Sequence, residues 1–215
     1  LTGLKGFKLW HDQVQYKPES KGGRLGWHQD LPKWPVLKSG TQITAWVALD
    51  DVSVINGCMA MVPGSHKLGE QNKWLNSHKG DWKLKNHSAF NGSPPQILCP
   101  LQKGHVHFHH SLTWHSSLPN LSKNPRKAVA FHFFGPDTVY NSSGNHIMKK
   151  YINSIDGIDN FPNKRTNWNA DIHLMSTFAF LSQEEVRVFA AKPQNYLIKE
   201  IYELVDPGTV LYIYA

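Results

Sequence analysis

Apolar and polar residues alternate along several short segments of the chain, with the period of two that is typical of β-strands. In the segment 41–52, Ile43, Ala45 and Val47 fall on one face and Trp46 on the other, which predicts a half-buried strand. The same pattern predicts strands in FKLWHDQVQYK, GCMAMV, QILCP, HVHFHH and RKAVAFHFF.

Clusters of Pro, Gly, Ser and Asn separate these segments, so the pattern indicates an antiparallel β-sandwich or barrel. We expect one domain over residues 1–215, with its β core at about 7–134 and a loop-rich insertion at 135–180. A helical segment is predicted at 181–205, because Ser182 and Glu185 form a capping box ahead of helically spaced apolar residues.

Composition narrows the class of protein. With 215 residues, 40% of them hydrophobic, the chain can bury one sizeable core. The formal charge of +7 comes from 23 Lys and Arg against 16 Asp and Glu, without a long basic block. This surplus is compatible with an anionic or a neutral small-molecule substrate, and we expect no nucleic-acid partner.

Two cysteines, Cys58 and Cys99, cannot form a disulfide framework, which favours a cytoplasmic protein. There is no run of about 18 apolar residues, so we expect no membrane partner. The chain begins at Leu1, within a segment that already has strand character, and we expect a further amino-terminal portion to precede it.

Thirteen histidines suggest metal chemistry, and His28-Gln29-Asp30 is the first candidate. An imidazole and a carboxylate at positions i and i+2 of a strand point to the same face. Iron(II) oxygenases use two imidazoles and one carboxylate and leave the remaining positions open. By itself the pair is a weak signal in so histidine-rich a chain.

The third ligand is sought among the five histidines between His105 and His115. His105, His107 and His109 alternate on one strand face, so a zinc site in the His105–His110 cluster is the rival interpretation. Ordinary packed histidines are a second alternative. Arg126, eleven residues after His115 and at the start of an apolar strand, favours a site for a carboxylate, because a buried guanidinium needs an anion.

Three segments in succession, WHQDLPKWP, LDDVSVINGCMAMVPGSHKLG and HHSLTWHSSLPNLSKNPRKA, resemble the signatures of the phytanoyl-CoA dioxygenase family of Fe(II)- and 2-oxoglutarate-dependent oxygenases. The resemblance runs from about Leu9 to Phe134, and the motifs follow the family order. It implies a mainly β fold, the double-stranded β-helix or cupin-like jelly-roll, with flanking helices. The carboxyl-terminal segment FLSQEEVRVFAAKPQNYLIKEIYELVDPGTV resembles the opening of the family's amino-terminal region.

The resemblance also implies the roles of individual residues. His28, Asp30 and His115 would bind the iron, and Arg126 would bind 2-oxoglutarate. Further contacts with the co-substrate are implied for Ser117, Trp46, Lys17 and Gln13.

The resemblance implies a dioxygenase that uses Fe(II), 2-oxoglutarate and O2 to hydroxylate or otherwise oxidise an unactivated carbon, releasing succinate and CO2. The alternatives are a catalytically inactive jelly-roll that only binds its ligand, and a zinc-dependent enzyme that uses the His105–His110 cluster.

Overall fold

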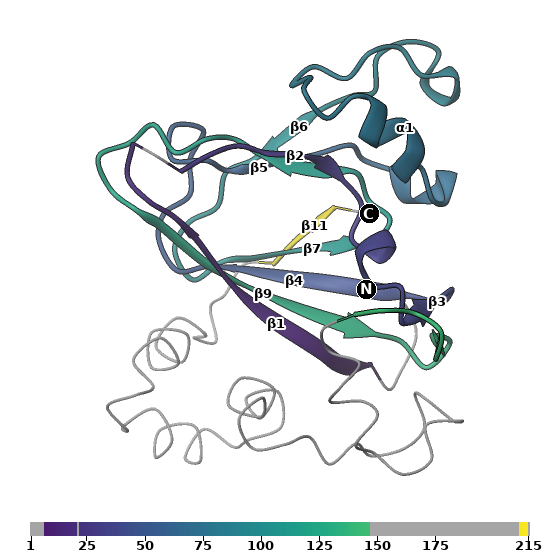
Figure 1. Ribbon diagram of the computed structural model, residues 1–215. Coiled ribbons are helices and arrows are strands. Elements are labelled where there is room, and N and C mark those ends of the chain that lie inside the picture. Colours follow the sequence, from purple (N-terminus) through teal and green to yellow (C-terminus); the bar gives the residue numbers. More distant parts are fainter. Residues whose placement is uncertain (1–6, 21, 147–210, 215) are drawn as a thin grey trace, which may run out of the picture.

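The computed structural model describes residues 7–20, 22–146 and 211–214. Two β-sheets face each other and form the body of this part of the chain, as Figure 1 shows. The larger sheet has the strand order β1 (Lys8–Lys17), β9 (Arg126–Phe134), β4 (Gln42–Ala48), β7 (Val106–His110) and β11 (Leu211–Tyr214). The smaller sheet has the order β2 (Leu25–His28), β8 (His115–Ser117), β5 (Met59–Met61) and β6 (Ile97–Cys99).

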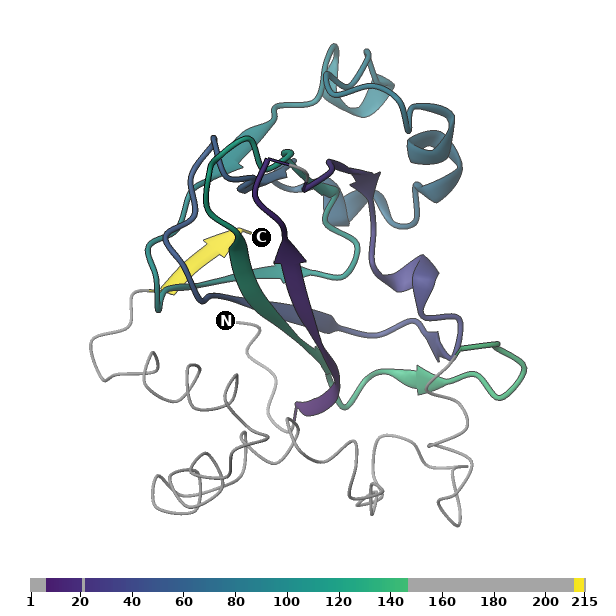
Figure 2. The ribbon, with the colours of Figure 1, turned by 60° about the vertical axis from the view of Figure 1, so that its left-hand side comes forward.

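All neighbouring strands in the two sheets are antiparallel except β11, which pairs with β7 in parallel. Figure 2 shows β11 beside β7 at the edge of the larger sheet. A short two-stranded ribbon, β3 (Leu37–Lys38) with β10 (Val139–Tyr140), extends from the body. The mainly β architecture predicted from the alternating pattern is confirmed.

Helices are few and short in the described part. The α-helix α1 (Asn72–Ser77) lies against β2. Single 3₁₀ turns make up η1 (Leu31–Lys33), η2 (Ser65–Leu68) and η3 (Ser88–Phe90). The helices expected over 181–205, and most of the insertion expected over 135–180, lie outside the described residues.

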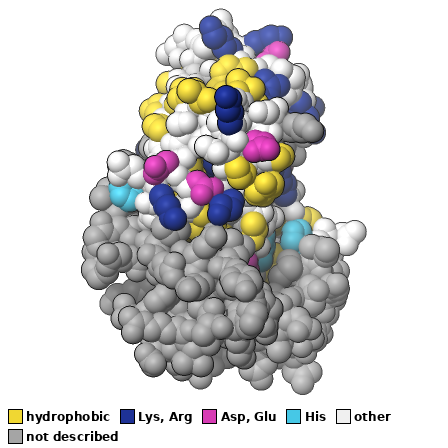
Figure 3. Space-filling model, turned by 90° about the vertical axis from the view of Figure 1, so that its left-hand side faces the viewer, with side chains coloured by type: hydrophobic (Ala, Val, Ile, Leu, Met, Phe, Trp, Pro, Cys, Tyr) yellow, Lys and Arg dark blue, Asp and Glu magenta, His cyan; other side chains and the backbone are white. Residues whose placement is uncertain are grey.

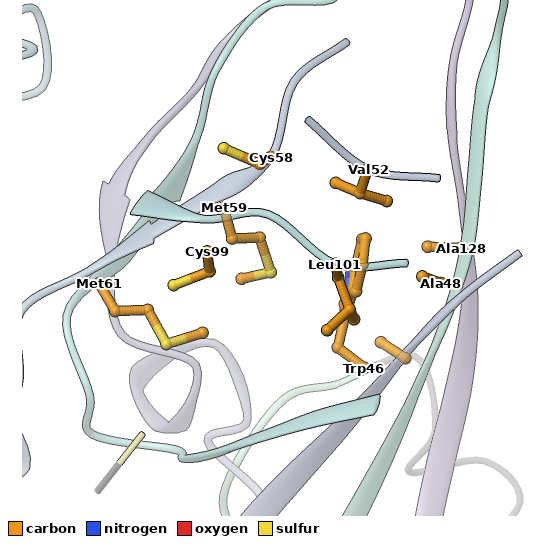
Figure 4. Close-up of a cluster of buried hydrophobic side chains, with 10 residues drawn as sticks. Trp46, Ala48, Val52, Cys58, Met59, Met61, Cys99, Leu101 and Ala128 are labelled. Carbon is orange, nitrogen blue, oxygen red and sulfur yellow. The ribbon is translucent and has the colours of Figure 1, made fainter. Parts of the chain in front are cut away.

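The main core fills the space between the sheets. Trp46 from β4 and Met59 and Met61 from β5 belong there to one cluster, with Leu101 beside Trp46, as Figure 4 shows, and all of these side chains are buried. Cys58 and Cys99 belong to the same cluster and are not disulfide-bonded. Trp46 therefore reaches from the larger sheet into the interior, where a site between the sheets can form.

The strand β4 differs from the expectation that one of its faces would be exposed. Among its seven residues only Ile43 is not fully buried. The strand lies between β9 and β7, and Ala45 and Val47 pack with Val129 on the side facing away from the smaller sheet. Its apolar alternation reflects two packed faces, since Trp46 on the opposite side is buried as well.

Candidate metal and co-substrate site

The segment that carries His28 and Asp30 changes conformation between these two residues. The strand β2 ends at His28, whereas Asp30 has helical dihedral angles and precedes η1. The expectation of a strand through Asp30 is therefore wrong. The reason is local, because Pro32 has no N–H for strand pairing, and the backbone N–H of Asp30 instead donates to the carbonyl of Ser111 at 2.8 Å.

Gln29, between the two candidate ligands, anchors this bend. Its side chain is fully buried, and its amide nitrogen donates to the carbonyls of Gly69 and Leu112 at 2.9 and 2.8 Å. Its side-chain oxygen accepts from the backbone N–H of Gln71 at 2.7 Å. The bend is thus tied to two other loops, a role that the sequence pattern did not reveal.

Strand pairing brings the third candidate to the same point. His115 opens β8 and is the register partner of His28 on β2. The Nε2 atoms of His28 and His115 lie 3.7 and 3.5 Å from Oδ1 of Asp30. The ligand atoms of the three residues all lie within 4.8 Å of one another. A single cation can therefore contact all three side chains.

Hydrogen bonds fix the tautomers of both imidazoles. Nδ1 of His28 lies 2.8 Å from the carbonyl of Gly26, and Nδ1 of His115 lies 2.9 Å from the carbonyl of Thr113. A carbonyl can only accept, so each Nδ1 carries a proton, and each Nε2 faces Asp30, where it can bind a metal ion through its lone pair. Two imidazole nitrogens and a carboxylate oxygen that converge in this way fit a metal ion, and a donated Nδ1–H is the usual support of a metal-binding histidine.

The second oxygen of Asp30 is held from the other side. Its Oδ2 accepts from the Thr44 hydroxyl at 3.2 Å and lies 3.4 Å from Nε2 of His109. Burial acts to raise the pKa of Asp30, but the adjacent His115 and His109 hold it well below the usual value. Asp30 is therefore a carboxylate, as a metal ligand must be.

The histidine-rich strand β7 does not form a separate metal site in the described part of the chain. His109 faces Asp30, and the ring of His107 stacks on Trp46 with centroids 5.1 Å apart. Within 7–20, 22–146 and 211–214, the only group of at least three His, Cys, Asp or Glu side chains placed to share a metal ion is His28, Asp30 and His115. The zinc alternative thus has no separate site among these residues.

Arg126 and Lys17 form a buried cationic pair near this centre. They are register partners in the β1–β9 ladder, and their residues are 2% and 8% exposed. Nε and Nη1 of Arg126 have no hydrogen-bond partner, while its guanidinium carbon lies 5.1 Å from the centroid of Trp46. Burial lowers the pKa of Arg126 to about 10, and burial together with Arg126 lowers the pKa of Lys17 to about 8. An unpaired buried guanidinium is costly unless an anion meets it.

A cavity of about 170 Å³ connects the metal centre to its surroundings. His28, Asp30 and His115 line it together with Gln13, Trp46 and Ser117. It shares Gln15, Leu25 and Ser117 with an adjoining hollow that Lys17 and Arg126 line. The two spaces are therefore neighbours, and the cationic pair lies at one end of the cavity.

Gln15 is a residue of this site that the sequence analysis missed. Its side-chain oxygen accepts from Nε1 of Trp46 at 2.9 Å, which fixes the indole beside the cavity. The alternation of β1 could have found it, because Gln15 lies between Gln13 and Lys17 on the same strand face. Thr44 and His132, which also line the cavity, carried no motif that pointed to them.

Comparisons with known proteins show the family of this chain. The family model described as Phytanoyl-CoA dioxygenase (PhyH) matches residues 5–128. The human protein "Phytanoyl-CoA dioxygenase, peroxisomal" is 28% identical over 175 residues, which are 74% of this chain and 50% of that protein. Its Rattus norvegicus counterpart is 30% identical over 139 residues, 60% of this chain and 40% of that protein. This chain thus spans about half the length of the curated relatives it matches.

A solved structure of similar fold supports the architecture. The non-heme alpha ketoglutarate dependent carbocyclase SnoK from nogalamycin biosynthesis is 24% identical, with a TM-score of 0.56 over 74% of this chain and 60% of that one. At this level of identity the likeness concerns the fold alone. It confirms the predicted double-stranded β-helix.

Proposed function

Because this chain belongs to the phytanoyl-CoA dioxygenase family, we propose that it is an Fe(II)- and 2-oxoglutarate-dependent dioxygenase that oxidises an unactivated carbon of a small organic substrate. The observation that carries the proposal is the convergence of three acceptor atoms, from His28, Asp30 and His115, beside a buried guanidinium with two unpaired nitrogens. A dioxygenase of this type needs three ligands for the iron and a cationic group that binds the carboxylate of 2-oxoglutarate.

In this proposal His28, Asp30 and His115 hold the iron on one face and leave positions open for the co-substrate and dioxygen. Bound iron supplies the oxidising power, with 2-oxoglutarate converted to succinate and CO2. The protein contributes orientation, because the Nδ1 protons of both histidines are committed to carbonyls and Oδ2 of Asp30 is held by Thr44.

The far carboxylate of 2-oxoglutarate would meet Arg126 in a bidentate pair, with Lys17 adding a second positive charge. Ser117 lines both the metal cavity and the hollow beside Arg126, a position suited to donating a hydroxyl hydrogen bond to the same co-substrate. The Arg126 guanidinium lies beside the ring of Trp46, and Trp46 and Gln13 both line the metal cavity, where they can contact the co-substrate. The reaction proposed for the substrate carbon is hydroxylation.

The charge of the substrate and the location of the protein are the remaining parts of this proposal. The positive charge surplus is compatible with an anionic substrate, and neutral compounds fit the same site chemistry. Within the described residues no helix is long and apolar enough to cross a membrane. A cytoplasmic location stays a prediction, and the mammalian relatives are named as peroxisomal proteins.

The test is succinate formation by the purified chain after anaerobic loading with Fe(II), with 2-oxoglutarate, oxygen and a panel of candidate substrates. We expect succinate release that one or more substrates accelerate, and loss of this release in His28→Ala. A protein that only binds its ligand would form no succinate under any condition. Turnover supported by Zn(II) without consumption of 2-oxoglutarate would favour the zinc alternative.

A further inference from the structure

A hydrogen-bond chain leads from Asp30 to β9, where it ends six residues along the strand from Arg126. Thr44 on β4 and His132 on β9 are register partners, and Oγ1 of Thr44 lies 2.8 Å from Nδ1 of His132. The same hydroxyl lies 3.2 Å from Oδ2 of Asp30. All three side chains are buried, so Thr44 is a bridge between the carboxylate and the imidazole.

The direction of each hydrogen bond in this chain is fixed by the donor inventory. The Asp30 carboxylate can only accept, and Thr44 has a single hydroxyl proton. Thr44 must therefore donate to Asp30 and accept from His132. It follows that Nδ1 of His132 carries the proton and that its Nε2 presents a lone pair.

This lone pair has no partner among the described residues. His132 is 4% exposed, and its Nε2 is buried without a hydrogen bond. The side chain lines the metal cavity, where the ring of Trp34 lies 4.8 Å from that of His132 in an edge contact. A buried acceptor that lines a cavity needs a donor, and a ligand or a water molecule in that cavity can supply it.

We propose that His132 is a specificity-determining residue, whose Nε2 accepts a hydrogen bond from a hydroxyl or amide N–H of the substrate. Thr44 is then a positioning residue that fixes the tautomer. The inference rests on the proposed function, since it places the substrate at the end of the cavity away from Arg126. Burial lowers the pKa of His132 to about 3, so the ring is neutral at physiological pH and offers no charge to an anionic group.

The tautomer can be measured without turnover. The full chain, labelled with ¹⁵N-histidine and loaded with diamagnetic Zn(II) and 2-oxoglutarate, is studied by long-range ¹H–¹⁵N correlation, with His132→Phe to assign the signal. We expect a protonated Nδ1 and a bare Nε2 at His132. Thr44→Val keeps the side-chain shape and should yield a mixture of tautomers. A protonated Nε2 in the parent protein would overturn the proposal.

Ligand preference is tested on the same Zn(II) form with three matched probes: benzyl alcohol, benzyl methyl ether and benzoate. We expect benzyl alcohol to move the Nε2 signal of His132 and to bind about tenfold more weakly to His132→Phe. The ether should bind both proteins alike, and His78→Phe, away from the cavity, should match the parent. Tighter binding of benzoate than of the alcohol, or no response of the Nε2 signal to any probe, would overturn the proposal.

Failure of this inference can be distinguished from failure of the proposed function. Succinate formation tests the iron and 2-oxoglutarate chemistry, whereas the NMR titration tests the acceptor at His132 in a form that does not turn over. Active enzyme with a protonated Nε2 would refute the role of His132 alone. Absence of succinate formation under every condition would remove the proposed function, whatever the probes show.

Discussion

At the scale of single residues, Arg126 illustrates how burial creates a demand for a ligand. The guanidinium is almost completely enclosed, two of its nitrogens have no hydrogen-bond partner, and Lys17 adds a second positive charge beside it. The sequence indicated this residue because an arginine at the start of an apolar strand has few stable environments. The structure adds the pair with Lys17 and the contact with Trp46.

Arg126→Ala should raise the apparent KM for 2-oxoglutarate by about thirty-fold or more, since losing one partner of a buried charge pair costs about 2–5 kcal/mol. Iron affinity should change little, because Arg126 is not among the three converging ligands. Steady-state kinetics and an Fe(II) titration check the two effects. Arg126→Lys is the matched control. It keeps the positive charge but loses the paired N–H groups of the guanidinium, so its KM for 2-oxoglutarate should be intermediate. An unchanged KM in Arg126→Ala would contradict the assignment.

His115→Ala should weaken Fe(II) binding by more than about a hundredfold, which exceeds the effect typical of residues that only support a ligand. The control is His110→Ala, because His110 is on the same stretch but its Nδ1 accepts from the backbone N–H of Leu112 at 3.1 Å. Anaerobic titration with Fe(II) compares the two variants. If His110→Ala lost Fe(II) binding and His115→Ala bound Fe(II) normally, His110 and not His115 would be the iron ligand.

Residue-scale prediction from sequence succeeded where a side chain has few acceptable environments, and the positions of His28 and Asp30 show its limit. Their spacing suggested a shared strand face, yet the strand ends at His28 and the bend after it brings Asp30 to the same point. The alternation of apolar residues cannot predict that bend, because it depends on Pro32, on the hydrogen bond from Asp30 to the carbonyl of Ser111 and on those from the side chain of Gln29. Thr44 and His132 were missed because their pairing depends on strand register.

At the scale of elements, segments with an alternating apolar pattern were predictable, including GCMAMV and QILCP, which contain the three-residue strands β5 and β6. The strand expected over RKAVAFHFF is β9, with the same bounds, and the first expected strand is β1 to within one residue. The strands β3 and β10 have two residues each, too few to establish a period, and β8 has no apolar residue. Their strand conformation comes from pairing with segments distant in the sequence, which composition cannot reveal.

The loop that carries Gln29 gives a prediction at this scale. Gln29→Leu should lower the free energy of unfolding by about 2–4 kcal/mol, because two carbonyls and one N–H lose buried partners. Urea denaturation measures the loss. Gln102→Leu, at an exposed position, is the matched control and should change stability by less than about 0.5 kcal/mol. Equal stability of both variants would show that the amide does not anchor the bend.

At the scale of the whole molecule, the facing sheets bring together residues that are far apart in the sequence. His28 and His115 meet through the β2–β8 pairing, and Lys17 meets Arg126 through the β1–β9 pairing. The net positive charge is not concentrated over the described residues on the face shown in Figure 3, where Lys and Arg lie among Asp, Glu and apolar side chains. The described residues on this face form no continuous basic stripe of the kind that binds nucleic acid.

Buried neutral histidines predict acid sensitivity of the fold. Burial lowers the pKa of His11 to about 4 and that of His132 to about 3, so protonation favours the unfolded chain. Neither histidine lowers the free energy of unfolding above pH 6.5, where both are neutral in the folded and the unfolded chain. Below pH 6.5 each histidine lowers it by about 1.4 kcal/mol per pH unit, until the pH reaches the pKa of that histidine in the folded protein. Asp12 partly offsets this loss, because burial raises its pKa to about 6.

Unfolding free energy measured in chelator between pH 7.5 and 4.5 checks this prediction, since metal release is then removed as a cause. His11→Phe cannot take up the proton and should reduce the slope by about 1.4 kcal/mol per pH unit. A slope that is unchanged in His11→Phe would show that His11 does not contribute to acid sensitivity.

The ladder between β1 and β9 runs without a shift from the pair His11 and His132 to the pair Lys17 and Arg126. Six residues of extended chain separate His132 from Arg126, which corresponds to about 20 Å at the rise of a β-strand. The strand β9 therefore fixes the spacing between a guanidinium and an imidazole acceptor that serve the same site. This spacing is set by backbone geometry, so the surrounding loops can change without altering it.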